Sequence, residues 1–179
     1  RATGVSDRYP VEEQVRLFAL LRAGMQRAGI IFNPAEDNSL ILVRRTEKAL
    51  AGHGASAHRY RVETAAEVPA AAQKAAAEND CVIVNGDNLT TRHLSAVAWA
   101  CREAGTPLFV GDVASVAQGA VASVSPNYRH IGLVAGLQAA RILEGEEPGR
   151  IPSALPQRFD YALNPRAARS MGLAIPPEL

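Results

Sequence analysis

The chain has 179 residues, of which 47% are apolar and 21% charged, and this length and composition predict one or at most two globular domains and exclude a disordered or fibrous chain. Nineteen basic and eighteen acidic residues leave a formal charge of +1 with no run of one sign, which argues against a nucleic-acid groove. Its apolar stretches are all far shorter than the ~20 residues of a membrane helix.

Two hydrophobic periods alternate along the chain. Apolar residues three to four apart predict amphipathic helices, and short, nearly continuous apolar runs predict buried strands. In chain order these are a helix at 11–21, a strand at 28–32, a helix at 40–50, a strand at 57–62, a helix from about 67, a strand at 81–84, a helix at 94–101 with Thr90 as its cap, strands at 107–110 and 120–124, a helix at 127–143, a strand at 159–163 and a short helix that opens at Asn164–Pro165.

This alternation predicts the fold class. Apolar strands that alternate with helices of ten or more residues indicate βαβ units and a parallel sheet covered on both faces. Right-handed crossovers then give an open, doubly wound α/β sheet, a Rossmann-like fold. In such sheets, ligands bind beyond the carboxyl ends of the strands.

Polar residues gather where three of the predicted strands end. The segments 33–39, 85–88 and 111–112 place along one sheet edge the residues Glu36, Asp37, Asn38, Ser39, Asp87, Asn88 and Asp112. The free amides that start a helix at Ser39, together with the Asn38 and Ser39 side chains, suit a carboxylate or another anion. Asp87 and Asp112 suit an ammonium group or a metal, so the set would fit a zwitterion such as an amino acid.

A purely structural interpretation of this edge stays open, because Asp, Asn and Ser at such turns often only cap helices. Catalytic and cofactor motifs are lacking: the sequence holds no G-x-G-x-x-G or P-loop after a strand, no G-x-S-x-G and no H-E-x-x-H. No cofactor is therefore predicted. Cys81 and Cys101 are interpreted as buried free thiols, with a disulfide or a reactive thiol as alternatives.

The stretch at 29–39, Gly-Ile-Ile-Phe-Asn-Pro-Ala-Glu-Asp-Asn-Ser, resembles bacterial ABC-transporter substrate-binding proteins of the tryptophan-receptor-like type, which have the type I periplasmic-binding fold. The resemblance runs nearly end to end. The other segments that resemble the family are 3–6, Asp87–Asn88, 107–112, 119–123, 127–132, 145–148, 164–172 and 175–176.

The resemblance covers only the second lobe of such a receptor. It implies that residues 1–179 form a single ligand-binding lobe, and that the segment 119–143 crosses to complete a first lobe that this chain does not contain. We expect that segment either to fold back onto its own lobe or to pair with a second copy by exchange, which would give a homodimer. The chain opens without Met or a targeting segment, so a longer protein is expected.

The resemblance also implies a function. Such a protein captures a small solute, often an amino acid, between two lobes outside the cytoplasm, in the periplasm or at the cell surface, and delivers it to a membrane permease without catalysing a reaction. The implied ligand-binding residues are Asn38 and Ser39 for an anionic group, Asp87 and more weakly Asp112 for a cationic group, with Glu36 and Asn88 beside them. No metal or nucleic acid is implied.

Two other functions remain as alternatives. One is a ligand-sensing regulatory domain of the same fold, joined in a longer protein to a signalling module. The other is a Mg²⁺-dependent phosphoryl-transfer enzyme that uses Asp87 and Asp112. This enzyme would lack a second acid adjacent to either Asp and a loop that cradles phosphate, and it is the weaker alternative.

Overall fold

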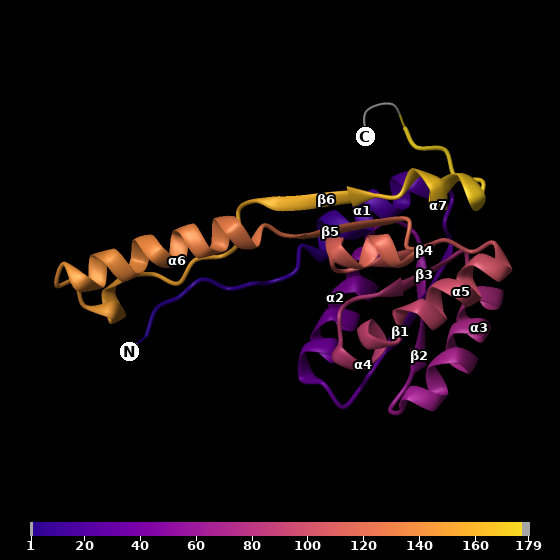
Figure 1. Cartoon of the computed structure of the whole chain (residues 1–179), viewed down its shortest axis with the longest axis horizontal. Helices are drawn as coiled ribbons and strands as arrows, with labels where there is room; N and C mark the ends of the chain where they lie inside the picture. Colours follow the sequence, from indigo (N-terminus) through magenta and orange to yellow (C-terminus); the bar gives the residue numbers. More distant parts are fainter. Residues whose placement is uncertain (1, 177–179) are drawn as a thin grey trace. The chain divides into compact units, whose positions relative to one another are not determined.

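The structure is a computed structural model that describes residues 2–176, so residue 1 and residues 177–179 of the predicted lobe lie outside it (Figure 1). Helices and strands alternate as predicted through the first half of the chain. The elements are α1 (Val11–Leu21), β1 (Arg27–Phe32), α2 (Asp37–Gly52), β2 (Ser56–Arg61), the short 3₁₀ turn η1 (Ala65–Glu67), α3 (Val68–Glu78) and β3 (Cys81–Val84).

The alternation continues through the second half of the chain. These are α4 (Asn88–Arg92), α5 (Leu94–Ala104), β4 (Leu108–Val110), the 3₁₀ turn η2 (Val113–Gln118), β5 (Ala122–Pro126), α6 (Tyr128–Leu143), the 3₁₀ turn η3 (Pro148–Arg150), β6 (Phe159–Leu163) and α7 (Pro165–Ser170). The predicted α/β class is confirmed, and the predicted helices and strands agree with the observed ones to within a few residues. The separate α4 turn is the main addition.

Six strands form one sheet in the order β2-β1-β3-β4-β5-β6. The first five are parallel, as the pairs Ala28↔Cys81, Ile83↔Phe109 and Phe109↔Ala122 illustrate. The last strand runs antiparallel, because the amide of Asn164, just after β6, donates to the carbonyl oxygen of Val121, just before β5. The carboxyl ends of β1, β3 and β4 therefore meet at one edge of the sheet.

The sheet is buried on both faces, which explains its apolar strands. Every residue of β3, β4 and β5 is buried, whereas the edge strand β2 buries only Tyr60. Figure 1 shows α2 on one side of the sheet and α3 and α5 on the other. Helix α1 packs against α2, and the Phe18 ring stacks on the Phe109 ring of β4 with 4.3 Å between centroids.

The chain divides into two compact units. The sheet unit comprises Val11–Val124 and the residues from Tyr161 onward, and the α6 unit comprises the residues up to Pro10 together with Ser125–Asp160. The strands β5 and β6 each pass from one unit to the other. Residues 119–124 thus belong to the sheet unit, while the role of 119–143 in completing another lobe stays a prediction.

Helix α6 buries few of its side chains within the α6 unit. Asn127 caps α6 by accepting a hydrogen bond from the His130 amide at 2.7 Å, and its Nδ2 donates to Asp160 Oδ1 at the same distance. Within α6 only Gln138 is buried, and its Nε2 donates to the Pro152 carbonyl oxygen at 3.1 Å. Leucine side chains of the helix stay exposed, among them Leu133 at 60% and Leu137 at 59%.

The stacked Phe18–Phe109 pair predicts where the sheet unit is most sensitive to truncation. We expect Phe18→Ala to lower the free energy of unfolding by about 3–5 kcal/mol, because a fully buried aromatic side chain leaves a cavity. Leu20→Ala on the same helix removes a half-exposed side chain and should cost less than about 1 kcal/mol. Urea unfolding followed by circular dichroism measures both, and equal losses would contradict the packing described here.

Candidate ligand-binding edge

The structure brings together the loops that carry most of the predicted site residues. Glu36 lies between β1 and α2, Asp87 lies between β3 and α4, Asn88 is the first residue of α4, and Asp112 follows β4. Because β1, β3 and β4 are neighbours in the sheet, these three loops converge at its carboxyl edge. Hydrogen bonds join the loop after β1 to the turn after β3 and hold the two side by side.

Glu36 ties the first loop to the second. Its carboxylate accepts hydrogen bonds from the Asn88 backbone amide at 3.0 and 3.1 Å and from Asn88 Nδ2 at 2.7 Å. Asn33 Nδ2, within the first loop, donates to the same carboxylate at 3.2 Å. Partial burial by itself would raise the pKa of Glu36, but the hydrogen bonds from Asn88 and Asn33 outweigh it and lower the pKa below its ordinary value.

Asp87 is the second link between these loops and is 2% exposed. It caps α4 by accepting hydrogen bonds from the Thr90 amide at 2.7 Å and the Thr90 hydroxyl at 2.6 Å, and it accepts a third from the Asn33 amide at 3.2 Å. Thr90 was expected to cap the helix at 94–101, which was wrong: His93 precedes α5, and Thr90 lies inside the separate helix α4, whose cap is Asp87. The reason is that a helical turn already starts at Asn88, before the first residue that the apolar spacing indicated.

A carboxylate offers about four lone-pair positions, so the Asp87 side chain has little capacity left for a ligand. Its predicted contact with an ammonium group stays a prediction. The structure adds a positioning role, because Asp87 fixes both its own turn and the backbone that follows β1.

Asp112 is the more accessible of the two predicted acids. It is partly exposed and opens the η2 turn, where its carboxylate accepts hydrogen bonds from the Ala114 amide at 3.3 Å and the Ser115 hydroxyl at 3.1 Å. A small recess joins it to the β3–α4 turn, lined in part by Gly86, Thr91 and Ser115. Its volume of about 10 Å³ cannot hold an amino acid, so this recess by itself is not a solute site.

The start of α2 differs from the prediction. The helix begins at Asp37 instead of Ser39, and the Ser39 amide donates to the Glu36 carbonyl oxygen at 3.0 Å. The expectation of a free amide at Ser39 was therefore wrong, and the Ser39 side chain is buried at 3% exposure. Asn38 is exposed in the first turn and remains available to a ligand.

Three buried polar residues that the sequence analysis did not single out support this edge. Gln14 of α1 is 1% exposed, and its Nε2 donates to the carbonyl oxygens of Gly111 at 3.2 Å and Val124 at 2.6 Å. Asn85, directly after β3, donates from Nδ2 to the Thr46 hydroxyl of α2 at 2.5 Å. A signal was present for Gln14, which is a polar residue on the face that Val11, Val15 and Phe18 mark as apolar.

The thiols and histidines provide no second site in the part of the chain that is described. Cys81 and Cys101 are free and buried, as expected, and burial raises the pKa of Cys101 to about 12 and that of Cys81 further. Such thiols stay protonated and unreactive. Residues 2–176 contain no group of three or more His, Cys, Asp or Glu placed to hold a metal ion, and none of their helices is long and apolar enough to cross a membrane.

The hydrogen bonds to Glu36 predict a pH dependence. A lowered pKa means that the ionised carboxylate stabilises the folded chain above the ordinary pKa near 4.5, and that this contribution is lost as the pH falls through the folded-state pKa. We therefore expect Glu36→Gln to be less stable than the wild type at pH 7, with the difference shrinking toward pH 3. Urea unfolding at several pH values measures this difference.

Glu103→Gln is the matched control for the Glu36 prediction, because Glu103 is exposed on α5 and its ion pair with Arg102 is 3.8 Å long. Its stability difference from the wild type should stay small from pH 7 to pH 3. A constant difference for Glu36→Gln over the same range would contradict the assignment of these hydrogen bonds to the ionised carboxylate.

Comparison with known proteins identifies a family and a shared fold. The family model described as ABC transporter substrate binding protein matches residues 1–179. A tyrosine-binding protein of Clostridioides difficile (strain R20291) is 25% identical over 171 residues, which are 96% of this chain and 50% of that protein. The chain thus spans about half the length of this curated relative.

Solved structures share the fold. A conserved domain protein from Vibrio cholerae superposes with a TM-score of 0.86 at 31% identity, over 98% of this chain and 60% of that one. The ABC domain in complex with L-Trp from Streptococcus pneumonia superposes with a TM-score of 0.85 at 24% identity, over 98% and 61%. With the family model matched over its whole length, the chain belongs to the ABC transporter substrate-binding proteins.

Proposed function

We propose that this chain is one lobe of the solute-binding component of an ABC importer, which captures an amino acid outside the cytoplasm and delivers it to a membrane permease. The observation that carries the proposal is the match of the family model to all 179 residues. The polar carboxyl edge supports it, because this is where open α/β sheets bind ligands. Binding and release, with no chemical step, is the activity that follows from membership of this family.

The proposed solute is an aromatic amino acid. Two relatives that match nearly the whole chain are described as tyrosine-binding and as a complex with L-Trp. In this chain, Asn38 would bind the solute carboxylate beside Ser39, and Asp112 would accept hydrogen bonds from the ammonium group. Glu36, Asp87 and Asn88 would chiefly hold the loops in register, since their polar atoms already bond to one another or to the adjacent backbone.

Closure of a second lobe would complete the site. The recess beside Asp112 measures about 10 Å³, whereas small-molecule sites usually measure 300–1,000 Å³ and bury most of the ligand. The tyrosine-binding relative is about twice as long as the region matched, which leaves room for that lobe. A hinge that closes two lobes around a solute is a common way to signal the bound state to a partner.

A thermal-shift measurement on the full-length gene product tests the proposed function. A ligand at about 100 times its dissociation constant adds about 2.7 kcal/mol to the free energy of unfolding, which raises Tm by several degrees. We expect tyrosine or tryptophan to give such a shift, and glucose and Mg²⁺ to give none. Asp112→Asn should reduce the shift, while the exposed control Glu103→Gln should keep it.

Other results would contradict the proposed function. A shift with Mg²⁺ or a phosphate ester alone would favour a phosphoryl-transfer enzyme. If no amino acid shifted Tm, the proposal that this protein is the amino-acid-binding component of an importer would be wrong. An undiminished shift in Asp112→Asn would be compatible with the proposed function, but it would contradict the proposed role of Asp112 in binding the solute.

We further propose that the exposed apolar side chains of α6, including Leu133 and Leu137, are covered by a second copy of this 179-residue chain when the first lobe is absent. Light scattering after size exclusion should then show a dimer that Leu133→Ser/Leu137→Ser converts to a monomer. The exposed pair Arg44→Ser/Lys48→Ser on α2 serves as the control and should remain dimeric. If the wild-type chain were a monomer at every concentration, the proposal that a second copy covers α6 would be wrong.

A further inference from the structure

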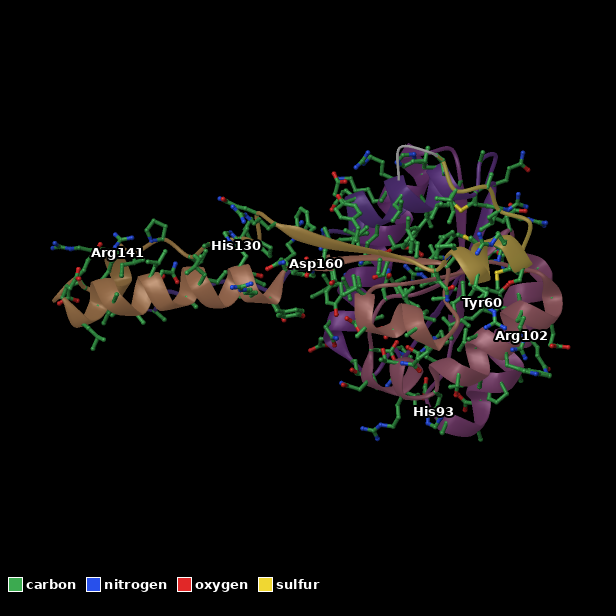
Figure 2. The ribbon with its side chains drawn as sticks, turned by 45° about the horizontal axis from the view of Figure 1, so that its top comes forward. Tyr60, His93, Arg102, His130, Arg141 and Asp160 are labelled. Atoms are coloured by element: carbon green, nitrogen blue, oxygen red, sulfur yellow. The ribbon has the colours of Figure 1, made fainter. Side chains whose placement is uncertain are left out.

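A groove of about 620 Å³ lies in the sheet unit, away from the proposed solute site. It is bounded by α5, by the end of η2 and by α7. Its principal side chains are Trp99 and Arg102 of α5, Gln118 of η2, Asn164 and Arg166 at the start of α7, and Met171 after it. Figure 2 shows Arg102 at the surface of α5.

The groove is at the opposite edge of the sheet from the carboxyl edge. Gly119, which lines the groove, comes just before β5, and Asn164 comes just after the antiparallel strand β6. Both residues therefore lie where the parallel strands begin. A ligand in this groove would be separated from Glu36 and Asp112 by the length of the sheet.

The lining carries positive charge without a matching acid. Arg102 and Arg166 line the groove, and no Asp or Glu is among the lining residues. Within residues 2–176, Arg102 forms one ion pair, with the neighbouring Glu103 at 3.8 Å, and this pair is weak because both side chains are more than half exposed. Arg166 is exposed and takes part in none of the ion pairs found within residues 2–176.

An apolar surface lies beside these charges. Trp99 is 50% exposed although it is the largest side chain of α5, and the nearly buried Ala98 and Ala167 line the groove with it. Guanidinium groups bind carboxylates through two parallel hydrogen bonds, and an indole ring offers a flat face for stacking. The combination matches a ligand with an anionic end and a flat apolar body.

We propose that this groove binds a small organic carboxylate with an aromatic body, at a site separate from the solute site at the carboxyl edge. Arg102 and Arg166 bind the carboxylate, and Trp99 packs against the ring. The volume lies within the 300–1,000 Å³ usual for small-molecule sites, which favours such a ligand over an extended acidic peptide. The lack of an acid in the lining disfavours an organic cation.

Trp99 is the only tryptophan of the chain, so its fluorescence reports on this groove. We would titrate the 179-residue chain with benzoate, and with benzyl alcohol and benzylamine as neutral and cationic analogues. Benzoate should change the Trp99 emission in a saturable manner, with an apparent dissociation constant at least tenfold lower than that of either analogue. Isothermal titration calorimetry of the wild type should give the same constant.

Matched variants identify the contacts. Arg102→Gln and Arg166→Gln should each weaken benzoate binding at least fivefold, whereas Arg44→Gln, the same change at an exposed position of α2, should leave it unchanged. By calorimetry, Trp99→Ala should also weaken binding. Circular dichroism spectra and Tm values equal to those of the wild type establish that each variant is folded.

Several outcomes would overturn the proposal. These are the absence of a saturable change with benzoate, equal affinity for benzylamine, or an equal effect of Arg44→Gln and the groove variants. Binding of a Glu-rich peptide in the absence of benzoate binding would also overturn it, and would assign the groove to a protein partner. None of these results depends on whether the carboxyl edge binds an amino acid.

Discussion

Buried polar side chains at the strand ends hold the carboxyl edge together, and the rest of the sheet unit depends on them. Parallel strands all finish at this edge, and the loops that leave it must satisfy backbone groups away from water. Gln14 does this for Gly111 and Val124 by donating to both carbonyl oxygens. Asp87 does it for Thr90 and Asn33 by accepting from both amides. These bonds add to the backbone hydrogen bonds that hold the same loops.

The same constraint limits what the edge can do chemically. Each polar atom used to hold a loop is less available to a ligand, and Asp87 and Glu36 are largely used in this way. Asn38 and Asp112 are nearer to the surface. A solute site on this lobe would thus consist of a few accessible groups supported by a rigid, internally bonded layer, an arrangement that favours precise positioning of a ligand.

The two units differ in how completely they bury their apolar residues. In the sheet unit, β3, β4 and β5 are enclosed by helices and the Phe18–Phe109 stack. In the α6 unit, the helix buries only Gln138 and leaves leucines exposed. An exposed row of large apolar side chains is typical of a surface that packs against another part of the protein. The partial coverage of the relatives by this chain agrees with that interpretation.

The sequence by itself determined the α/β fold, because the continuous apolar runs of the strands and the period-3.6 pattern of the helices depend only on neighbours along the chain. It also located the polar turns after β1, β3 and β4, since parallel strands must end at one edge. Only the tertiary structure decided what each polar residue does there. Asp87 caps α4 and the Ser39 amide bonds to Glu36 through local contacts, but the bonds from Asn33 to Asp87 and from Asn88 to Glu36 join loops about fifty residues apart. The groove at Trp99 also required the tertiary structure, because the residues of α5 and α7 that line it are far apart in the sequence.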